Sequence, residues 1–169
     1  SVTFQSDASF DAVTDGAKIN WGGPEEGKTL NFGFEGAERT LEVKGLGRQE
    51  IRKAFTIPSN GVIRIIGTAS QSSQGVDLNL PTGQRLVVEG ELDNHGVLTL
   101  ISGGIQKTGL GGVINSGIFS VIGAANYLDL ANSGSLVQLG NITYGVIRHT
   151  AQSTHRITSA DLLPAHPTA

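Results

Sequence analysis

Apolar and polar residues alternate with a period of two along most of this chain. Such alternation is typical of β-strands with one buried face. It predicts strands at residues 29–34, 39–43, 62–66, 85–89, 97–101, 118–122 and 135–139. Helical composition is confined to residues 48–55 (RQEIRKAF) and to one capped turn at 158–163 before Pro164. The pattern therefore predicts an all-β fold with little helix.

A short motif, Asn-x-Gly, precedes three of these strands, and a looser Asn-Gly precedes a fourth. The motif residues are Asn60, Gly61, Asn94, Gly96, Asn115, Gly117, Asn132 and Gly134. The asparagines are 34, 21 and 17 residues apart. Asn and Gly both tolerate a positive φ, so each motif is predicted to form a corner where the backbone turns at low steric cost.

Repeats of about 17 to 22 residues, each with a corner and one or two short strands, fit the stacked levels of a parallel β-helix (solenoid). Stacking is required because no single level can bury its own apolar face. Antiparallel hairpins also use Asn-Gly corners, and the uneven spacing suits the loops of a jelly roll or β-sandwich. A short parallel β-helix is the expected fold, with the jelly roll or β-sandwich as the alternative.

The chain of 169 residues is long enough to form one compact domain without disulfide or metal support. Within it, residues 57–148 form the predicted β-repeat region. Residues 1–50 hold the only Trp and four of the six Phe. Residues 1–56 are predicted to form an N-terminal β cap over unpaired strand groups. Residues 149–169 form a C-terminal tail, in which Leu162 and Leu163 are expected to reach a neighbouring molecule.

Composition excludes several classes of protein. The chain has no Cys, which removes disulfides, thiolate metal sites and thiol nucleophiles. The net charge is −3 and the twelve Lys and Arg are scattered, which argues against a nucleic-acid partner. No apolar run approaches the roughly 18 residues that span a bilayer, so membrane insertion is not expected. Ser1 is compatible with a trimmed Met or with a cleaved leader.

Three alternating acids, Glu89, Glu91 and Asp93, are the first candidates for catalysis. On one strand they would project from the same face at steps of about 7 Å, near the separation of paired glycosidase carboxylates. A solvated strand face, with the intervening residues pointing inward, explains the same pattern more simply. We therefore do not assign these acids a catalytic role.

Other motifs lack the spacing that their chemistry needs. The aspartates at 7, 11 and 15 are too widely spaced for a calcium loop, and the four His have no metal-ligand spacing. The glycine clusters at 45–47 and 109–112 lack the residues of nucleotide-binding loops. The sequence thus predicts no catalytic, cofactor-binding or metal site, and a protein that is not an enzyme.

The pattern over residues 57–148 resembles the β-helical surface proteins of bacteria and phages: adhesin passengers, tailspikes and phage decoration proteins. Residues 10–16 (FDAVTDG) resemble in part the acidic segment that opens many pectin-lyase-like tailspikes, although the first glycine pair is missing. The resemblance implies a non-enzymatic phage capsid decoration (cement) or spike protein on the virion surface. It also implies a homo-oligomer, with a trimer expected.

The charge distribution supports a contact function. Residues 94–147 contain only Lys107 and Asp129 as charged residues, and charge normally keeps exposed sheets from associating. A second copy or a capsid shell protein is the expected partner. The candidate interface residues are Ile118, Phe119, Val121, Tyr127, Leu128, Leu136, Leu139, Leu162 and Leu163.

Two alternatives remain. A fragment of a secreted adhesin passenger would bind host glycan or protein at the bacterial cell surface or outside the cell. A carbohydrate-active β-helix is the weaker alternative, because Trp21, Tyr127 and Tyr144 are few platforms for stacking sugars.

Overall fold

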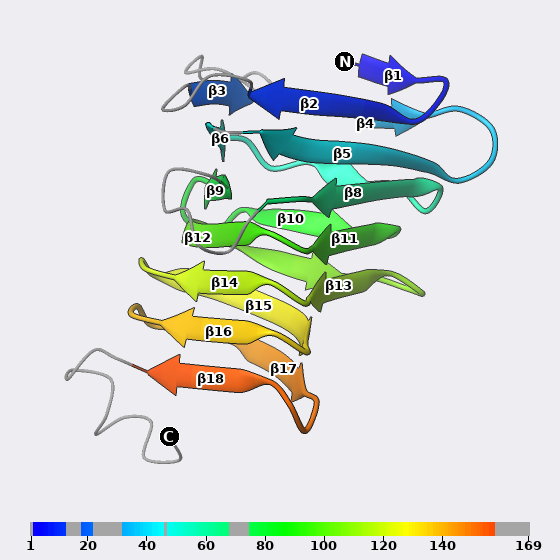
Figure 1. Ribbon diagram of the computed structural model, residues 1–169. Helices are drawn as coiled ribbons and strands as arrows, with labels where there is room; N and C mark the ends of the chain where they lie inside the picture. Colours follow the sequence, from blue (N-terminus) through cyan, green and yellow to red (C-terminus); the bar gives the residue numbers. More distant parts are fainter. Residues whose placement is uncertain (1, 13–17, 22–31, 46, 68–74, 158–169) are drawn as a thin grey trace.

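A computed structural model describes residues 2–12, 18–21, 32–45, 47–67 and 75–157. All of the regular elements in this part of the chain are β-strands, as Figure 1 shows. They are β1 (Val2–Phe4), β2 (Ala8–Ala12), β3 (Lys18–Trp21), β4 (Phe32–Phe34), β5 (Arg39–Gly45), β6 (Arg48–Ile51), β7 (Thr56–Ile57), β8 (Gly61–Ile65), β9 (Gly75–Asn79), β10 (Arg85–Val88), β11 (Glu91–Asn94), β12 (Val97–Lys107), β13 (Gly112–Asn115), β14 (Ile118–Val121), β15 (Ala125–Asn132), β16 (Ser135–Gln138), β17 (Gly145–His149) and β18 (Thr154–Ile157).

The strands form three ladders of parallel pairs. The first ladder joins β2, β5, β8, β11, β13, β15 and β17. The second joins β3, β6, β9, β12, β14, β16 and β18. The third joins β7, β10, the C-terminal half of β12 and the N-terminal part of β15, while β1 pairs with β4. In Figure 1 the strands follow one another from the N-terminus at the top to the C-terminus at the bottom.

The all-β prediction is confirmed, and the pairs between described strands are parallel throughout. A jelly roll or β-sandwich requires antiparallel pairs, so this topology does not fit that alternative. The helical composition of residues 48–55 does not produce a helix, because β6 occupies Arg48–Ile51 between β3 and β9. Its polar side chains find partners: the indole of Trp21 on β3 donates to Gln49 Oε1 at 2.9 Å, and the buried Glu50 pairs with Arg52, which directly follows β6. Residues 158–163 lie outside the described part.

Strand register keeps like residues in columns. Leu98, Phe119 and Leu136 are Cα partners in β12, β14 and β16, and all three are buried. Their neighbours Ile118 and Ser120 point to the other side of the sheet and are only half-buried. The period-two pattern therefore divides β12, β14 and β16 into a side that faces the core and a side that faces outward.

Aromatic side chains fill the core at the N-terminal end. Phe10 meets Trp21 edge to face with ring centroids 4.9 Å apart, and Phe32 meets Phe55 in the same geometry at 4.9 Å. The strands that carry the first 56 residues pair directly with those that follow, β5 with β8 and β6 with β9. The predicted N-terminal cap is thus continuous with the repeat region. At the other end, β18 continues the second ladder into the predicted tail.

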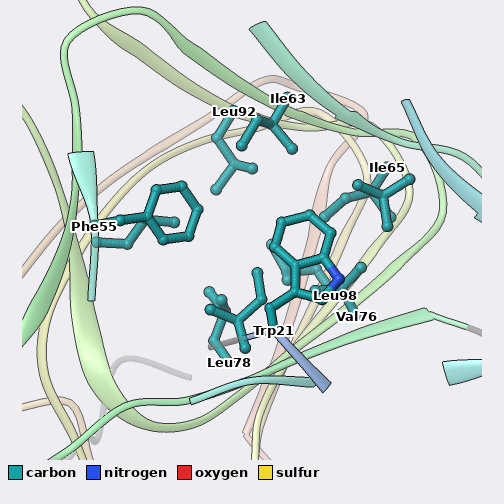
Figure 2. Close-up of a pocket in the computed structure, with 11 residues that line it drawn as sticks. Trp21, Phe55, Ile63, Ile65, Val76, Leu78, Leu92 and Leu98 are labelled. Atoms are coloured by element: carbon teal, nitrogen blue, oxygen red, sulfur yellow. The ribbon is translucent and has the colours of Figure 1, made fainter. Parts of the chain in front are cut away.

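A small apolar space lies in this part of the core. Figure 2 shows the side chains around it, including Trp21, Phe55, Leu78 and Leu98. The eleven lining residues are all apolar. The space is about as large as one water molecule, and an apolar space of that size stays dry. We interpret it as imperfect packing of large side chains rather than as a ligand pocket.

The motif glycines are needed for a reason other than the predicted positive φ. In the described residues, positive φ values occur at Gly36, Gly75, Gly83, Gly103 and Gly109, and at none of the motif positions. A Cβ at Gly117 would instead overlap the carbonyl oxygen of Gly96, and a Cβ at Gly134 that of Gly117. The glycines therefore permit close stacking of successive corners.

Candidate functional site

The motif asparagines form a buried column of hydrogen bonds. Asn94 Nδ2 donates to Asn115 Oδ1 at 2.7 Å, and Asn115 Nδ2 donates to Asn132 Oδ1 at 2.8 Å. The column ends at His149, whose Nδ1 lies 3.2 Å from Asn132 Nδ2. The three asparagines are at most 1% exposed, so their amides are unable to meet a ligand. Their role is to join successive strands from the inside.

Asn60 does not belong to this column. The residue in register with Asn94 on β8 is Ile65, whereas Asn60 lies at the start of that strand and donates to the backbone oxygen of Phe34. Gly61 instead stacks with Gly90, where a Cβ would overlap the Gly61 oxygen. The looser fourth copy thus forms a corner before β8, as expected. It does not extend the asparagine column, because Asn60 lies at the N-terminal end of β8 whereas Asn94 lies at the C-terminal end of β11.

A Ser, a His and an Asp meet on the surface beside the Asn column. His95 Nε2 lies 2.8 Å from Asp93 Oδ2, and its Nδ1 lies 2.9 Å from Ser116 Oγ. Arg64 Nε donates to the same Asp93 oxygen at 3.1 Å. These are the residue types of an acyl-transfer triad, and sequence reasoning missed the arrangement because β11 and β13 bring it together.

This cluster lacks the other parts of an acyl-transfer site. The backbone N–H groups of Ser116 and Gly117 both donate to the carbonyl oxygen of Asn94, so neither is available for an oxyanion. Ser133 repeats the turn one strand later, where its hydroxyl donates to the Asn115 oxygen at 3.1 Å. The cluster is therefore best explained as a corner network that holds Asp93.

The alternating acids do not form one solvated face. Glu89 is exposed in the turn after β10, whereas Asp93 is 7% exposed and held by Arg64 and His95. Leu92 points into the core between Glu91 and Asp93, as the alternation predicts. Burial raises the pKa of Glu91 above its ordinary value, and the neighbouring Asp93 charge adds to this effect.

The outward side of the second ladder is the most distinctive surface in the C-terminal half. Three successive strands, β12, β14 and β16, present three outward positions each, counting the residue that directly follows β14 and β16. We call these nine positions the uncharged face: Val97, Thr99, Ile101, Ile118, Ser120, Ile122, Ser135, Val137 and Leu139. Ile122 is 47% and Leu139 is 44% exposed, whereas Thr99 is buried.

The other two ladders carry charges on their outward sides. On the first ladder, Arg148 pairs with Asp129 at 2.9 Å. On the third, the guanidinium of Arg85 lies over the Tyr127 ring, 4.7 Å from its centroid. Register places Gly104 between these two residues, which leaves room for the stack. The nine positions of the uncharged face, by contrast, include no ionisable side chain.

The predicted interface residues divide between core and surface. Phe119, Val121, Leu128 and Leu136 are fully buried, so they have no surface to offer to a partner. Ile118 and Leu139 lie on the uncharged face, and Tyr127 lies under Arg85 on the third ladder. Leu162 and Leu163 lie outside the described residues.

Sequence reasoning missed the four other aliphatic members of the uncharged face, Val97, Ile101, Ile122 and Val137. The alternation in residues 97–101, 118–122 and 135–139 contains the signal. It does not say which of the two sides points outward, because both sides of these strands are rich in aliphatic residues.

A polar hollow lies on the first ladder near the N-terminus. Its walls include Ser9, Thr40, Glu42, Lys44 and Arg64. The backbone N–H of Thr40 donates to Asp7 Oδ1 at 2.9 Å, which closes one side of the hollow. Hydroxyl, carboxylate and ammonium groups thus face an open space that has no aromatic wall.

The described part of the chain contains no metal-binding cluster and no membrane-spanning helix. No group of three or more His, Cys, Asp or Glu side chains in that part is arranged to hold a metal ion. Nor does it contain a helix long and apolar enough to cross a membrane. No protein-family model, curated protein or solved structure matches the chain.

Proposed function

We propose that the protein is a short parallel β-helix that acts as a non-enzymatic structural component of a virus particle. The specific role is that of a phage capsid decoration (cement) or spike protein on the virion surface. It makes contacts with copies of itself and with a capsid shell protein. The observation that carries the proposal is the uncharged face, because an exposed aliphatic sheet surface without charges is characteristic of a contact surface.

The ladders support the β-helix description. Successive parallel pairs follow the order of the chain in all three ladders, and Asn94, Asn115 and Asn132 are joined through the interior. A body held by such columns resists bending, because each inner strand of a ladder is fixed on both sides by backbone hydrogen bonds. Rigidity of this kind suits a protein that presents a surface rather than one that closes around a substrate.

The chemistry of the candidate clusters supports a role without turnover. Ser116, His95 and Asp93 lack free backbone donors beside them, and the asparagine column is buried. The apolar space in the core has no polar wall. Contact through apolar area, at about 25 cal/mol per Å² buried, is the interaction that the outward residues offer.

Locating the chain in its source tests the proposal. Particles are purified from the source culture by density gradient and labelled with antibodies against the purified chain. We expect the label on intact particles, and its removal by a mild chaotrope should leave the capsids whole. Recovery of the chain in the cell-surface fraction, with unlabelled particles, would contradict the virion role.

The polar hollow favours one second candidate, a secreted adhesin that binds host glycan. Sugar hydroxyls would hydrogen-bond with Thr40, Glu42 and Lys44. A glycan array probed with the chain and with a Lys44→Ala, Glu42→Ala variant tests this function. Binding that the variant loses would favour the adhesin, and equal signals from both proteins would remove the hollow from consideration.

A further inference from the structure

We propose that the uncharged face is a two-fold contact between two copies of this chain, with the symmetry axis near Ser120. The inference rests on the proposed contact function and names both its partner and its surface. In a two-fold contact the same patch is used by both molecules. Ser120 is the centre of the patch because it lies on the middle strand, between Ile118 and Ile122.

The shape of the face suits such a contact. Val97, Ile118 and Ser135 are Cα partners, as are Thr99, Ser120 and Val137, so the outward side chains form straight columns. Neighbouring strands lie about 4.8 Å apart, and alternate residues along a strand lie about 6.6 Å apart. A regular grid of short side chains gives a flat surface, and two such sheets pack at about 10 Å.

The absence of charge favours a second copy over a different protein. Residues near a two-fold axis face their own equivalents, so any ionisable side chain there would meet a like charge. A different partner would normally be matched by complementary charges, which give specificity and faster association. The nine positions of the uncharged face include no ionisable residue, which satisfies the condition for self-contact.

Charged residues begin at the edges of the face. In the column of Ser120, the next positions are Thr99 and Val137, and beyond them come Asp77 on β9 and Arg156 on β18. Asp77 is paired with Arg48 and is mostly buried. Arg156 is exposed, about 10 Å from Ser120 by strand spacing. The Ser120 column is therefore apolar or hydroxyl-bearing in its centre and charged at both ends, outside the uncharged face.

The size of the face sets the strength of the contact. Three strands of five residues cover roughly 14 Å by 17 Å, or about 240 Å². A standard interface buries about 800 Å² per partner, so this face supplies only the centre of one. We therefore expect a weak, reversible dimer rather than an obligate one.

The first test measures mass against concentration by sedimentation velocity and light scattering. At high concentration the mass should approach twice the 17.6 kDa of one chain, and dilution should return it to one chain. Ile122→Asp should weaken the dimer at least tenfold. Leu110→Asp is the matched control, because Leu110 is fully exposed in a turn away from the face. Circular dichroism and melting temperature verify that both variants fold.

The second test uses the lack of cysteine in the chain. Ser120→Cys should be linked into a dimer by a short bis-maleimide, because equivalent residues near a two-fold axis face each other. A cross-linker is needed because facing sheets lie about 10 Å apart, which is too far for a direct disulfide. Ser133→Cys, at an exposed corner, is the matched control and should remain monomeric at the same concentration. This test does not depend on a destabilising substitution.

Several outcomes would overturn the inference. They are a monomer at all concentrations, a trimer, a dimer that Ile122→Asp leaves intact, and equal cross-linking of the two cysteine variants. None of these results bears on whether the chain lies on virus particles. A dimer with the expected behaviour, together with unlabelled particles, would instead support the contact and refute the virion role.

Discussion

The side-chain amide of Asn115 donates to Oδ1 of Asn132 at 2.8 Å, from β13 to the neighbouring β15. The same amide lies 3.1 Å from the carbonyl oxygen of Ser135, and the Asn115 oxygen accepts from Asn94. One buried side chain thus satisfies polar groups of the strands on both sides. Such a group is costly to remove, because its partners stay buried without it.

Asn115→Ala tests the importance of this column. We expect the free energy of unfolding to fall by about 2 to 4 kcal/mol, because the oxygen of Asn132 and the carbonyl of Ser135 each lose a donor. Urea denaturation measures the difference. Asn141→Ala, at an exposed position, should change the stability by less than about 0.5 kcal/mol. Equal stability of the two variants would show that the column contributes little.

Close stacking of the corners gives a second prediction. A Cβ at Gly117 would overlap the Gly96 oxygen, whereas a Cβ at Gly112 would meet nothing nearer than 3.8 Å. Gly117→Ala should therefore lower the melting temperature strongly or prevent soluble expression, and Gly112→Ala should be tolerated. Thermal unfolding of the two purified variants makes the comparison. A stable Gly117→Ala protein would contradict the stacking of these corners.

The register of β14 gives a third prediction. Phe119 is fully buried and its neighbour Ile118 is half-buried on the uncharged face. Phe119→Ala should cost about 3 to 5 kcal/mol of unfolding free energy, the usual range for a buried Phe. Ile118→Ala should cost much less, since it removes partly exposed surface. The reverse order in chemical denaturation would indicate that the strand is shifted by one residue.

Glu91 gives a prediction about pH. Burial, with the neighbouring Asp93 charge, raises the pKa of Glu91 above its ordinary value of 4.5 in the folded state. Between 4.5 and the raised pKa the folded chain binds more protons than the unfolded chain, so this carboxyl lowers stability as pH rises through that window. Glu91→Gln should therefore raise the melting temperature at pH 7.

The gain from Glu91→Gln should shrink as pH falls toward 4.5 and disappear below it, because the carboxyl is then protonated in both states. Glu89→Gln, exposed two residues earlier, is the matched control for removing a carboxylate in this segment. Melting curves from pH 4 to pH 7 measure both variants. A gain from Glu91→Gln that does not change with pH would contradict the burial effect.

Much of the architecture could be predicted from the sequence. The alternation located β5, β8, β10, β14 and β16 to within two residues at each end, because alternation with a period of two is specific to β-strands. The motif placed the corners before β12, β14 and β16 correctly. Its physical reason was beyond reach, since the partner of Asn115 is 17 residues away in sequence and becomes visible only once the strands are paired.

The errors also have physical causes. Residues 48–51 look helical because Arg, Gln and Glu are good helix formers, but pairing on both sides of β6 overrides local preference. The uncharged face was visible as a scarcity of charge between residues 94 and 147. Which aliphatic side chains point outward depended on register, so Phe119 and Ile118 were placed in one set although they lie on opposite sides.

The repeating contact between motif glycines has an evolutionary meaning. Gly117 rests against Gly96, and Gly134 rests against Gly117 in the same way. Suppose that a second copy of residues 115–131 were inserted before Asn132. Its Asn and Gly would then stack on Asn115 and Gly117 on one side and on Asn132 and Gly134 on the other. Duplication of a whole segment in the gene would therefore lengthen the protein and keep the same contacts in the core. Deletion of a single residue would instead shift the register of that strand and bring its buried residues to the surface.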